Sequence, residues 1–321
     1  DGWDPHDWEI KQWRYVPTKD YGGPKVDLVT LKILSVSVSA DRKHVGLKLD
    51  GMKAGHVVYV HMKDAYVSDA GRPLWTTESW YTMNNIPVNN PVEVIPSPKY
   101  GNNTLTPSEQ ASNWKLLFDG KTLSGWHNYN KTTVGSSWKV KDEAIMLDAV
   151  KSPDGNWQAK DGGDIVTEDE YENYELDLEW KISPCGNSGI IYNVVESSDY
   201  DYVWQTGPEM QVLDNTCHPD ARFVTHRAGD LYDMIECKFT TVKQAGEWNK
   251  VRIIKNHGMV EHWLNGVKVV EYDMNADTWK EMISKSKFKD MKGFGLATKG
   301  KIALQDHGNT VWYRNIKIKT L

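Results

Sequence analysis

The sequence contains little cysteine, no long apolar run and no excess of positive charge. It has 321 residues, of which three are cysteines, too few for a framework of disulfides. No stretch approaches the roughly 18 consecutive apolar residues that a membrane-spanning helix needs. The formal net charge is −6 at pH 7, so the chain has no basic footprint for a phosphate backbone. We therefore expect neither a transmembrane segment nor a nucleic-acid partner.

The cysteines also lack the close Cys and His spacing that is typical of a zinc site. They lie at Cys185, Cys217 and Cys237, and an odd number leaves at least one thiol unpaired. We expect three small, buried apolar side chains at these positions.

Phenylalanine is scarce, with 5 residues, whereas Trp and Tyr number 15 each. Their rings combine a flat apolar face with a polar edge, which suits sugar rings as well as a buried core. The chain is 39% hydrophobic and 26% charged, which is typical of a globular protein and excludes a disordered one.

Proline clusters in one region of the chain. Five prolines lie between Ile86 and Asn113, where the sequence has almost no apolar periodicity. This composition predicts a stiff, extended linker over residues 96–112, between a module at 1–95 and a domain at 113–321. The chain begins with Asp1 rather than Met, so we expect it to be a piece of a larger multidomain protein.

Both predicted parts consist of strands. In the first part, alternation predicts a hairpin over residues 31–39 and 44–49, with further strands at 55–62 and 80–83. In the second part, the expected strands are 174–180, 188–195, 209–213, 248–254, 259–264, 267–272, 301–305 and 311–319. Asn265-Gly266 predicts a tight hairpin turn, and a helix with a capping Asp or Asn is expected over 277–283. The fold class is therefore all-β, with a two-sheet sandwich after a small all-β module.

Six blocks of the second part carry a resemblance to a known family. They are Leu116–Trp126, Tyr174–Ile190, Gly207–Asn215, His262–Gly266, Leu304–Gly308 and Arg314–Ile316. In this order they resemble the 3-keto-disaccharide hydrolase family over about residues 114–321. The resemblance implies a concanavalin-like jelly-roll sandwich, a periplasmic or extracellular location in bacteria, and glycoside or oligosaccharide substrates oxidised at C3.

Candidate site residues follow from the alternation of side chains along strands. Glu209 and Gln211 share one face of their strand, and Gln305 and His307 share one face of another. His262 lies on the face of two apolar neighbours just before the hairpin turn, where a core position is equally consistent with the pattern. We expect Glu209, His262 and His307 to be catalytic.

A 3-keto sugar defines what these residues must do. The carbonyl acidifies the C2 hydrogen, so a base can remove it, the C1 substituent leaves by β-elimination, and water then adds. His262 or His307 is the candidate base and Glu209 the candidate acid. Residues expected to contact the substrate are Gln211, Asp214, Tyr232, Gln305 and Arg314, with Lys181 as an alternative to Arg314 for stabilising negative charge.

A divalent metal ion is a further hypothesis. The residue types that would bind it are Glu209, Asp214, His218, His262 and His307, and the metal would polarise the keto oxygen. None of these residues shows a tight ligand spacing, so the sequence names no metal ligand.

Two other functions stay open. A conventional glycoside hydrolase on the same fold needs two carboxyl groups roughly 5 to 9.5 Å apart. Glu209 has no carboxylate two or four residues further along its face, although Asp233 or Glu261 could supply one from elsewhere. A non-catalytic carbohydrate-binding module would also explain the aromatic excess.

Overall fold

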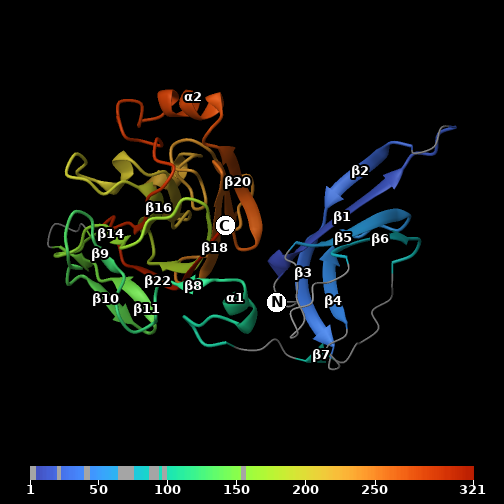
Figure 1. Cartoon of the computed structure of the whole chain (residues 1–321), viewed down its shortest axis with the longest axis horizontal. Helices are drawn as coiled ribbons and strands as arrows, with labels where there is room; N and C mark the ends of the chain where they lie inside the picture. The colour runs from blue at the N-terminus through green and yellow to red at the C-terminus, as the bar shows by residue number, and fades with distance from the viewer. Residues whose placement is uncertain are drawn as a thin grey trace. The chain divides into compact units, whose positions relative to one another are not determined.

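The computed structural model describes residues 5–19, 23–39, 44–63, 76–86, 94–95, 100–152 and 157–321. The chain divides into two compact units, Asp1–Lys99 and Tyr100–Leu321 (Figure 1). The turn of the predicted hairpin, at residues 40–43, and residues 96–99 of the predicted linker lie outside the described residues. No helix among the described residues is both long and apolar enough to cross a membrane.

The first unit contains two small antiparallel sheets after a short 3-10 turn, η1 (Pro5–Asp7). One has the order β2 (Lys25–Thr30), β1 (Trp8–Tyr15), β5 (His56–Met62), β6 (Glu78–Met83). The other has the order β4 (Val45–Asp50), β3 (Lys32–Ser39), β7 (Val94–Ile95). Apolar side chains of these strands, together with Leu31 between β2 and β3, form its core: Ile10, Leu31, Val58 and Met83. The expected hairpin is thus present as β3 and β4.

The second unit is a sandwich of two antiparallel sheets. The larger sheet has the order β10 (Trp138–Lys141), β11 (Ala144–Leu147), β22 (Val311–Thr320), β15 (Tyr174–Ile182), β18 (Asn249–Asn256), β19 (Met259–Leu264), β20 (Val267–Asp273), with β8 (Lys115–Leu116) beside β22. The smaller has the order β17 (Glu209–Leu213), β16 (Asn187–Val194), β21 (Lys301–Leu304), β14 (Ile165–Thr167), β9 (Trp126–Asn128). A two-stranded sheet, β12 (Val150–Lys151) with β13 (Trp157–Gln158), stands apart.

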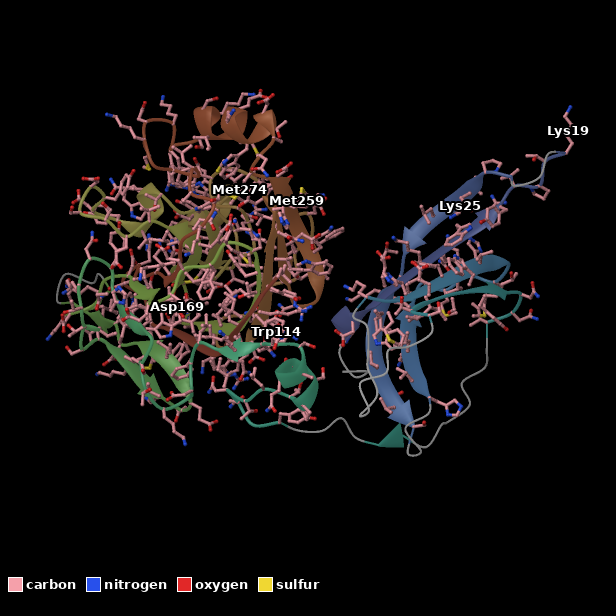
Figure 2. The ribbon with its side chains drawn as sticks, viewed as in Figure 1. Lys19, Lys25, Trp114, Asp169, Met259 and Met274 are labelled. Atoms are coloured by element: carbon pink, nitrogen blue, oxygen red, sulfur yellow. A yellow bond between two sulfur atoms is a disulfide. The ribbon has the colours of Figure 1, made fainter. Side chains whose placement is uncertain are left out.

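Alternating apolar residues from both sheets fill the space between them. Leu176, Leu178 and Ile253 of the larger sheet and Ile190 and Leu304 of the smaller one belong to one buried cluster. Figure 2 shows the side chains of this unit as a dense group. The all-β class and the sandwich predicted from the sequence are confirmed.

The turns between strands follow the chemistry of their residues. Asn265 (φ 51°) and Gly266 (φ 85°) join β19 to β20, as the tight-turn signal predicts. The helix α2 (Asp277–Lys285) is present, but its N-cap is Ala276, which makes no side-chain cap, so the expected capping Asp or Asn is wrong. Asp277 instead lies in the first turn, where its negative charge suits the helix dipole.

Residues 100–112 belong to the second unit and are not an extended linker. Thr106 caps a short helix, α1 (Pro107–Ala111), in a capping box with Glu109. Asn103 is buried and forms backbone-to-side-chain hydrogen bonds with Asn315 of β22 in both directions. These contacts fix the segment to the larger sheet, an arrangement that the proline count alone does not reveal.

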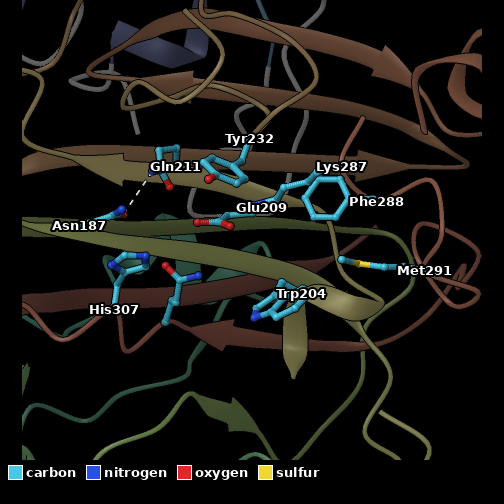
Figure 3. A pocket seen from close by; sticks show the side chains of 10 residues that line it. Asn187, Trp204, Glu209, Gln211, Tyr232, Lys287, Phe288, Met291 and His307 are labelled. Atoms are coloured by element: carbon cyan, nitrogen blue, oxygen red, sulfur yellow. Dashed lines mark hydrogen bonds between the residues drawn. The ribbon is translucent and has the colours of Figure 1, made fainter. Parts of the chain in front are cut away.

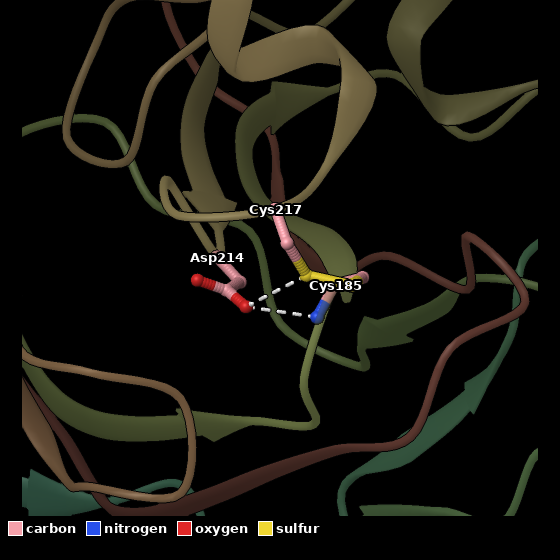
Figure 4. Close-up of side chains that lie close together, drawn as sticks. All are labelled: Cys185, Asp214 and Cys217. Atoms are coloured by element: carbon pink, nitrogen blue, oxygen red, sulfur yellow. Dashed lines mark hydrogen bonds between the residues drawn. A yellow bond between two sulfur atoms is a disulfide. The ribbon is translucent and has the colours of Figure 1, made fainter.

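Two of the three cysteines form a disulfide, which corrects the expectation of three separate apolar side chains. Cys185 and Cys217 are joined across a separation of 32 residues, and Cys237 is free. Asp214 accepts a hydrogen bond from the Cys185 backbone N–H at 2.8 Å (Figure 4). The bridge ties the β15–β16 connection to the loop after β17.

Candidate active site

One pocket of about 320 Å³ lies on the outer face of the smaller sheet (Figure 3). This volume is within the range of small-molecule sites. Its lining comes from β16, β17, the short 3-10 turn η2 (Val203–Gln205) and the segments that follow β17, β21 and α2. The lining residues are Asn187, Trp204, Glu209, Gln211, Tyr232, Lys287, Phe288, Met291, Gln305 and His307.

Strand alternation explains why polar side chains meet here. Met210 and Val212 point into the core between the sheets, so Glu209 and Gln211 point to the opposite face. Gly189 of β16 pairs with Gln211, and its carbonyl accepts the backbone N–H of Gln305. Five expected site residues, Glu209, Gln211, Tyr232, Gln305 and His307, therefore line one pocket.

Glu209 is held over a glycine. A Cβ placed on Gly189 would lie 2.1 Å from Glu209 Oε1, so the carboxyl occupies the space that a side chain at residue 189 would fill. Glu209 is 6% exposed, and this burial raises the pKa of Glu209 to about 8, although Lys287 opposes the shift. The carboxyl is thus protonated at neutral pH and can donate a proton.

Three amide side chains line the same pocket as this carboxyl. The side chains of Gln211 and Asn187 lie 3.2 Å apart, and exchanging N and O of the Gln211 amide places its nitrogen 2.8 Å from Glu209 Oε1. Gln305 is 8% exposed, and its Oε1 is a buried acceptor with no partner among the described residues. Since a buried acceptor without a donor is costly, Gln305 is suited to a hydroxyl group of a ligand.

Lys287 and Tyr232 form one wall of the pocket. Lys287 Nζ lies 4.0 Å from the centre of the Tyr232 ring, a cation–π distance. Burial lowers the pKa of Lys287, and Glu209 opposes this shift. The backbone N–H of Lys287 donates to Asp233 Oδ2 at 2.8 Å, which fixes the segment after α2. Burial raises the pKa of Tyr232 well above its usual range, so its hydroxyl stays protonated.

One end of the pocket is apolar. Trp204, Phe288 and Met291 lie there, and Phe288 stacks on Phe294 with ring centres 3.9 Å apart. Trp204 stacks on Tyr202, whose side chain is 52% exposed. The sequence did not predict these three residues, nor Lys287, because all four lie in segments without strand periodicity. It also did not predict Asn187, which lies in β16.

His307 is the histidine that the pocket contains. It is exposed, and its ring centre lies 6.3 Å from that of His218 in an edge-to-face arrangement. His262, in contrast, is 0% exposed in the core. Its Nε2 forms a hydrogen bond with the Tyr192 hydroxyl at 2.8 Å, and its Nδ1 lies 3.3 Å from the Gly229 carbonyl oxygen. Burial lowers the pKa of His262 to about 4. The expectation that His262 reaches substrate is therefore wrong, because its apolar neighbours face the core.

Asp214 and Arg314 have structural contacts outside the pocket lining. The Asp214 carboxylate accepts the backbone N–H groups of Cys185 and Thr216. On the larger sheet, Arg314 pairs with Glu179 at 2.7 Å and lies 4.0 Å from the Trp248 ring, which Lys181 also approaches. Neither cation lines the pocket.

Two of the five predicted metal ligands have surroundings that do not suit a metal ion. His262 is enclosed in the core, and Asp214 is occupied by backbone donors. In the part of the chain that the structure describes, one group has three candidate ligand atoms within 4.8 Å of one another: Cys185, Asp214 and Cys217. Two of these belong to the disulfide, so the donor set does not fit a divalent cation.

Comparison with known proteins identifies the second unit. Residues 113–319 match the family described as the 3-keto-α-glucoside-1,2-lyase-like domain. A "3-keto-disaccharide hydrolase" of Bacteroides thetaiotaomicron is 38% identical over 232 residues, which cover 66% of this chain and 79% of the relative. A crystal structure from Parabacteroides distasonis, provisionally assigned as a glycosyl hydrolase, has 34% identity and a TM-score of 0.61. The match covers 69% of this chain and 100% of that chain.

Proposed function

Because the chain belongs to the 3-keto-α-glucoside-1,2-lyase-like domain family, we propose that its pocket cleaves the glycosidic bond of a sugar oxidised at C3. The observation that supports this most strongly is the buried, protonated carboxyl of Glu209 in the same pocket as His307. An acid and a base in one pocket are what elimination from a keto sugar requires.

The proposed steps assign one proton to each group. His307 removes the C2 hydrogen as a proton, the electron pair forms an enolate with the C3 oxygen, and the C1–O bond breaks. Glu209 gives its proton to the departing oxygen, which leaves an enone and a carboxylate. Glu209 then takes a proton from water as the hydroxide adds to C1, and His307, whose proton exchanges with solvent, protonates C2. The net reaction is hydrolysis.

The other lining residues bind the substrate. Gln211, Asn187 and Gln305 offer amide groups for hydroxyls, and the unpartnered Gln305 Oε1 is an acceptor for one of them. Trp204 offers an aromatic face at the apolar end. The proposed steps use only side chains of the chain and route nothing through a metal ion.

A paired assay tests this function. The purified chain is incubated with a 3-keto-disaccharide and with its unoxidised parent, each with and without EDTA. We expect sugar release from the keto substrate alone, unaffected by EDTA. Equal cleavage of the parent would indicate a conventional hydrolase, and binding without cleavage of either would indicate a carbohydrate-binding module. Loss of activity in EDTA would restore the metal hypothesis.

We also propose a periplasmic or extracellular location. The Cys185–Cys217 disulfide supports it, since disulfides persist mainly in oxidising compartments. Thiol labelling of the chain in its native cells tests this: one reactive cysteine supports the proposal, and three contradict it.

A further inference from the structure

A second carboxyl group, Asp164, lies next to the pocket on the same sheet face. Ile165 of β14 pairs with Leu304 of β21, and both belong to the core between the sheets. Extending this antiparallel register by one residue brings Asp164 opposite Gln305, and alternation turns both to the outer face. Gln305 lines the pocket, and from this register we infer that Asp164, which is not itself among the lining residues, lies beside it one strand further along.

Strand spacing gives the separation of the two carboxyl groups. The carboxyl of Glu209 lies over Gly189 of β16, and the order β16-β21-β14 places Asp164 two strands away. At about 4.8 Å per strand, the two groups are about 10 Å apart or somewhat less where side chains lean inward. That span accommodates one sugar ring with a hydrogen bond of about 2.7 Å at each end.

Gln305 lies between the two carboxyl groups. Its unpartnered, nine-tenths buried Oε1 requires a donor that the described residues do not supply. Two carboxyl groups with a free acceptor between them can therefore form hydrogen bonds to several groups of a polyhydroxylated ligand.

We propose that protonated Asp164 donates a hydrogen bond to the C3 oxygen of the bound keto sugar, while Glu209 serves the oxygen on C1. This role rests on the proposed function. When the C2 proton leaves for the base, the electron pair moves onto the C3 oxygen, and Asp164 holds that oxygen without transferring its proton. The electron pair then leaves the C3 oxygen, the C1–C2 double bond forms and the C1–O bond breaks, while Glu209 protonates the departing oxygen. Asp164 ends the step as it began.

The surroundings of Asp164 favour its protonated form. Burial raises the pKa of Asp164 to about 7, and the nearby Asp306 carboxylate raises this pKa further. The backbone N–H of Asp306 has the opposite effect, because it donates a hydrogen bond to Asp164 Oδ1 at 2.8 Å. Glu209 and Tyr313 are the other titratable groups that interact with it. The cations expected to stabilise the enolate, Arg314 and Lys181, lie on the other sheet.

Two substitutions test the proposal. Asp164→Asn keeps an acceptor for Asp306 N–H and presents an amide donor that does not titrate, whereas Asp164→Ala removes both. We expect kcat/KM on a 3-keto-disaccharide to fall about 100- to 1,000-fold in Asp164→Ala. Asp164→Asn should stay within about tenfold at pH 6. Its alkaline loss of activity should move up by as much as one pH unit, from about 7 toward the value of about 8 for Glu209.

Asp161→Asn is the matched control, because Asp161 lies in the same loop and its exposed carboxylate bonds to Ser136. It should leave activity and the pH profile unchanged. An Asp164→Ala variant within threefold of wild type, or an Asp164→Asn variant with the wild-type alkaline limb, would overturn the proposal. If Asp164→Ala does not fold, the Asp164→Asn pH profile decides. If the wild type does not cleave the keto substrate, the proposed function itself is wrong. If the wild type cleaves it and the Asp164 variants do so equally well, only the role of Asp164 is wrong.

Discussion

The position of the Glu209 carboxyl depends on the absence of a side chain at Gly189. In Gly189→Ala the new Cβ would lie 2.1 Å from Oε1 and 2.6 Å from Cδ, against about 3.4 Å for an ordinary contact. The carboxyl must therefore move by about 1.3 Å, the difference between 3.4 and 2.1 Å. Since a displacement of about 1 Å of a catalytic group can cost about 100-fold, we expect kcat/KM on the keto substrate to fall by that factor.

Stability should change little in this variant. Gly189 does not have a positive φ, so the backbone tolerates alanine at this position. Replacing a glycine within a strand raises the unfolding free energy by about 0.5–1 kcal/mol, which offsets the cost of moving Glu209. Thermal melting and steady-state kinetics on one preparation separate the two effects. Gly101→Ala is the control, because its nearest neighbouring atom is 3.9 Å away. A folded Gly189→Ala enzyme with activity within threefold of wild type would refute the assigned role of Glu209.

Three further predictions follow from the same contacts. Glu209→Gln should lower kcat about 100- to 10,000-fold, and the activity that Asp164→Asn retains should decline as pH rises through about 8, where Glu209 loses its proton. An unchanged kcat would contradict the role of Glu209 as the acid. His262→Ala should lower the unfolding free energy measured in urea by about 2–4 kcal/mol, because packing and the bond to Tyr192 are lost. The kcat of the folded variant should stay within threefold of wild type. A 100-fold loss of kcat would instead indicate that His262 takes part in the reaction. Reduction of the Cys185–Cys217 disulfide should lower the unfolding free energy by about 3–4 kcal/mol, from closure of a 32-residue loop, and an unaltered denaturation midpoint would show that the bridge is not formed in solution.

His262 also predicts an acid limit to stability. Burial holds the pKa of His262 at about 4, below its ordinary value of 6.5, so the unfolded chain binds this proton more readily than the folded one. The unfolding free energy therefore falls as pH drops from about 6.5 to about 4, by about 3 kcal/mol from this residue. Urea denaturation across this range measures the loss, which His262→Ala should lack.

The sequence predicted those parts of the site that lie on regular strands. Alternation along β17 placed Glu209 and Gln211 on one face, and the same rule at the end of β21 placed Gln305 and His307. It failed for His262, because alternation says which residues share a face and not whether that face meets the core or the pocket. The flanking Val260 and Leu264, both fully buried, were the signal for the core.

Other parts of the site depend on tertiary contacts that no local pattern encodes. Lys287 and Phe288 reach the pocket from an irregular turn that a bond to Asp233 and the Phe288–Phe294 stack hold in place. The Cys185–Cys217 pairing joins residues far apart in the chain. Asp164 lacks a strand pattern of its own, since β14 has three residues, and its position follows only from the register with β21.

The most direct test of the account is the fate of the C2 hydrogen. The keto substrate is cleaved in D2O and the released keto sugar is examined by NMR, with an enzyme-free incubation to measure background exchange. Because His307 is exposed, the proton that it takes from C2 exchanges with solvent before C2 is protonated again. Elimination followed by hydration therefore predicts deuterium at C2 of the product, with incorporation that tracks turnover and falls in parallel with it in Gly189→Ala. Cleavage that leaves hydrogen at C2 would contradict the mechanism and would indicate direct hydrolysis at C1.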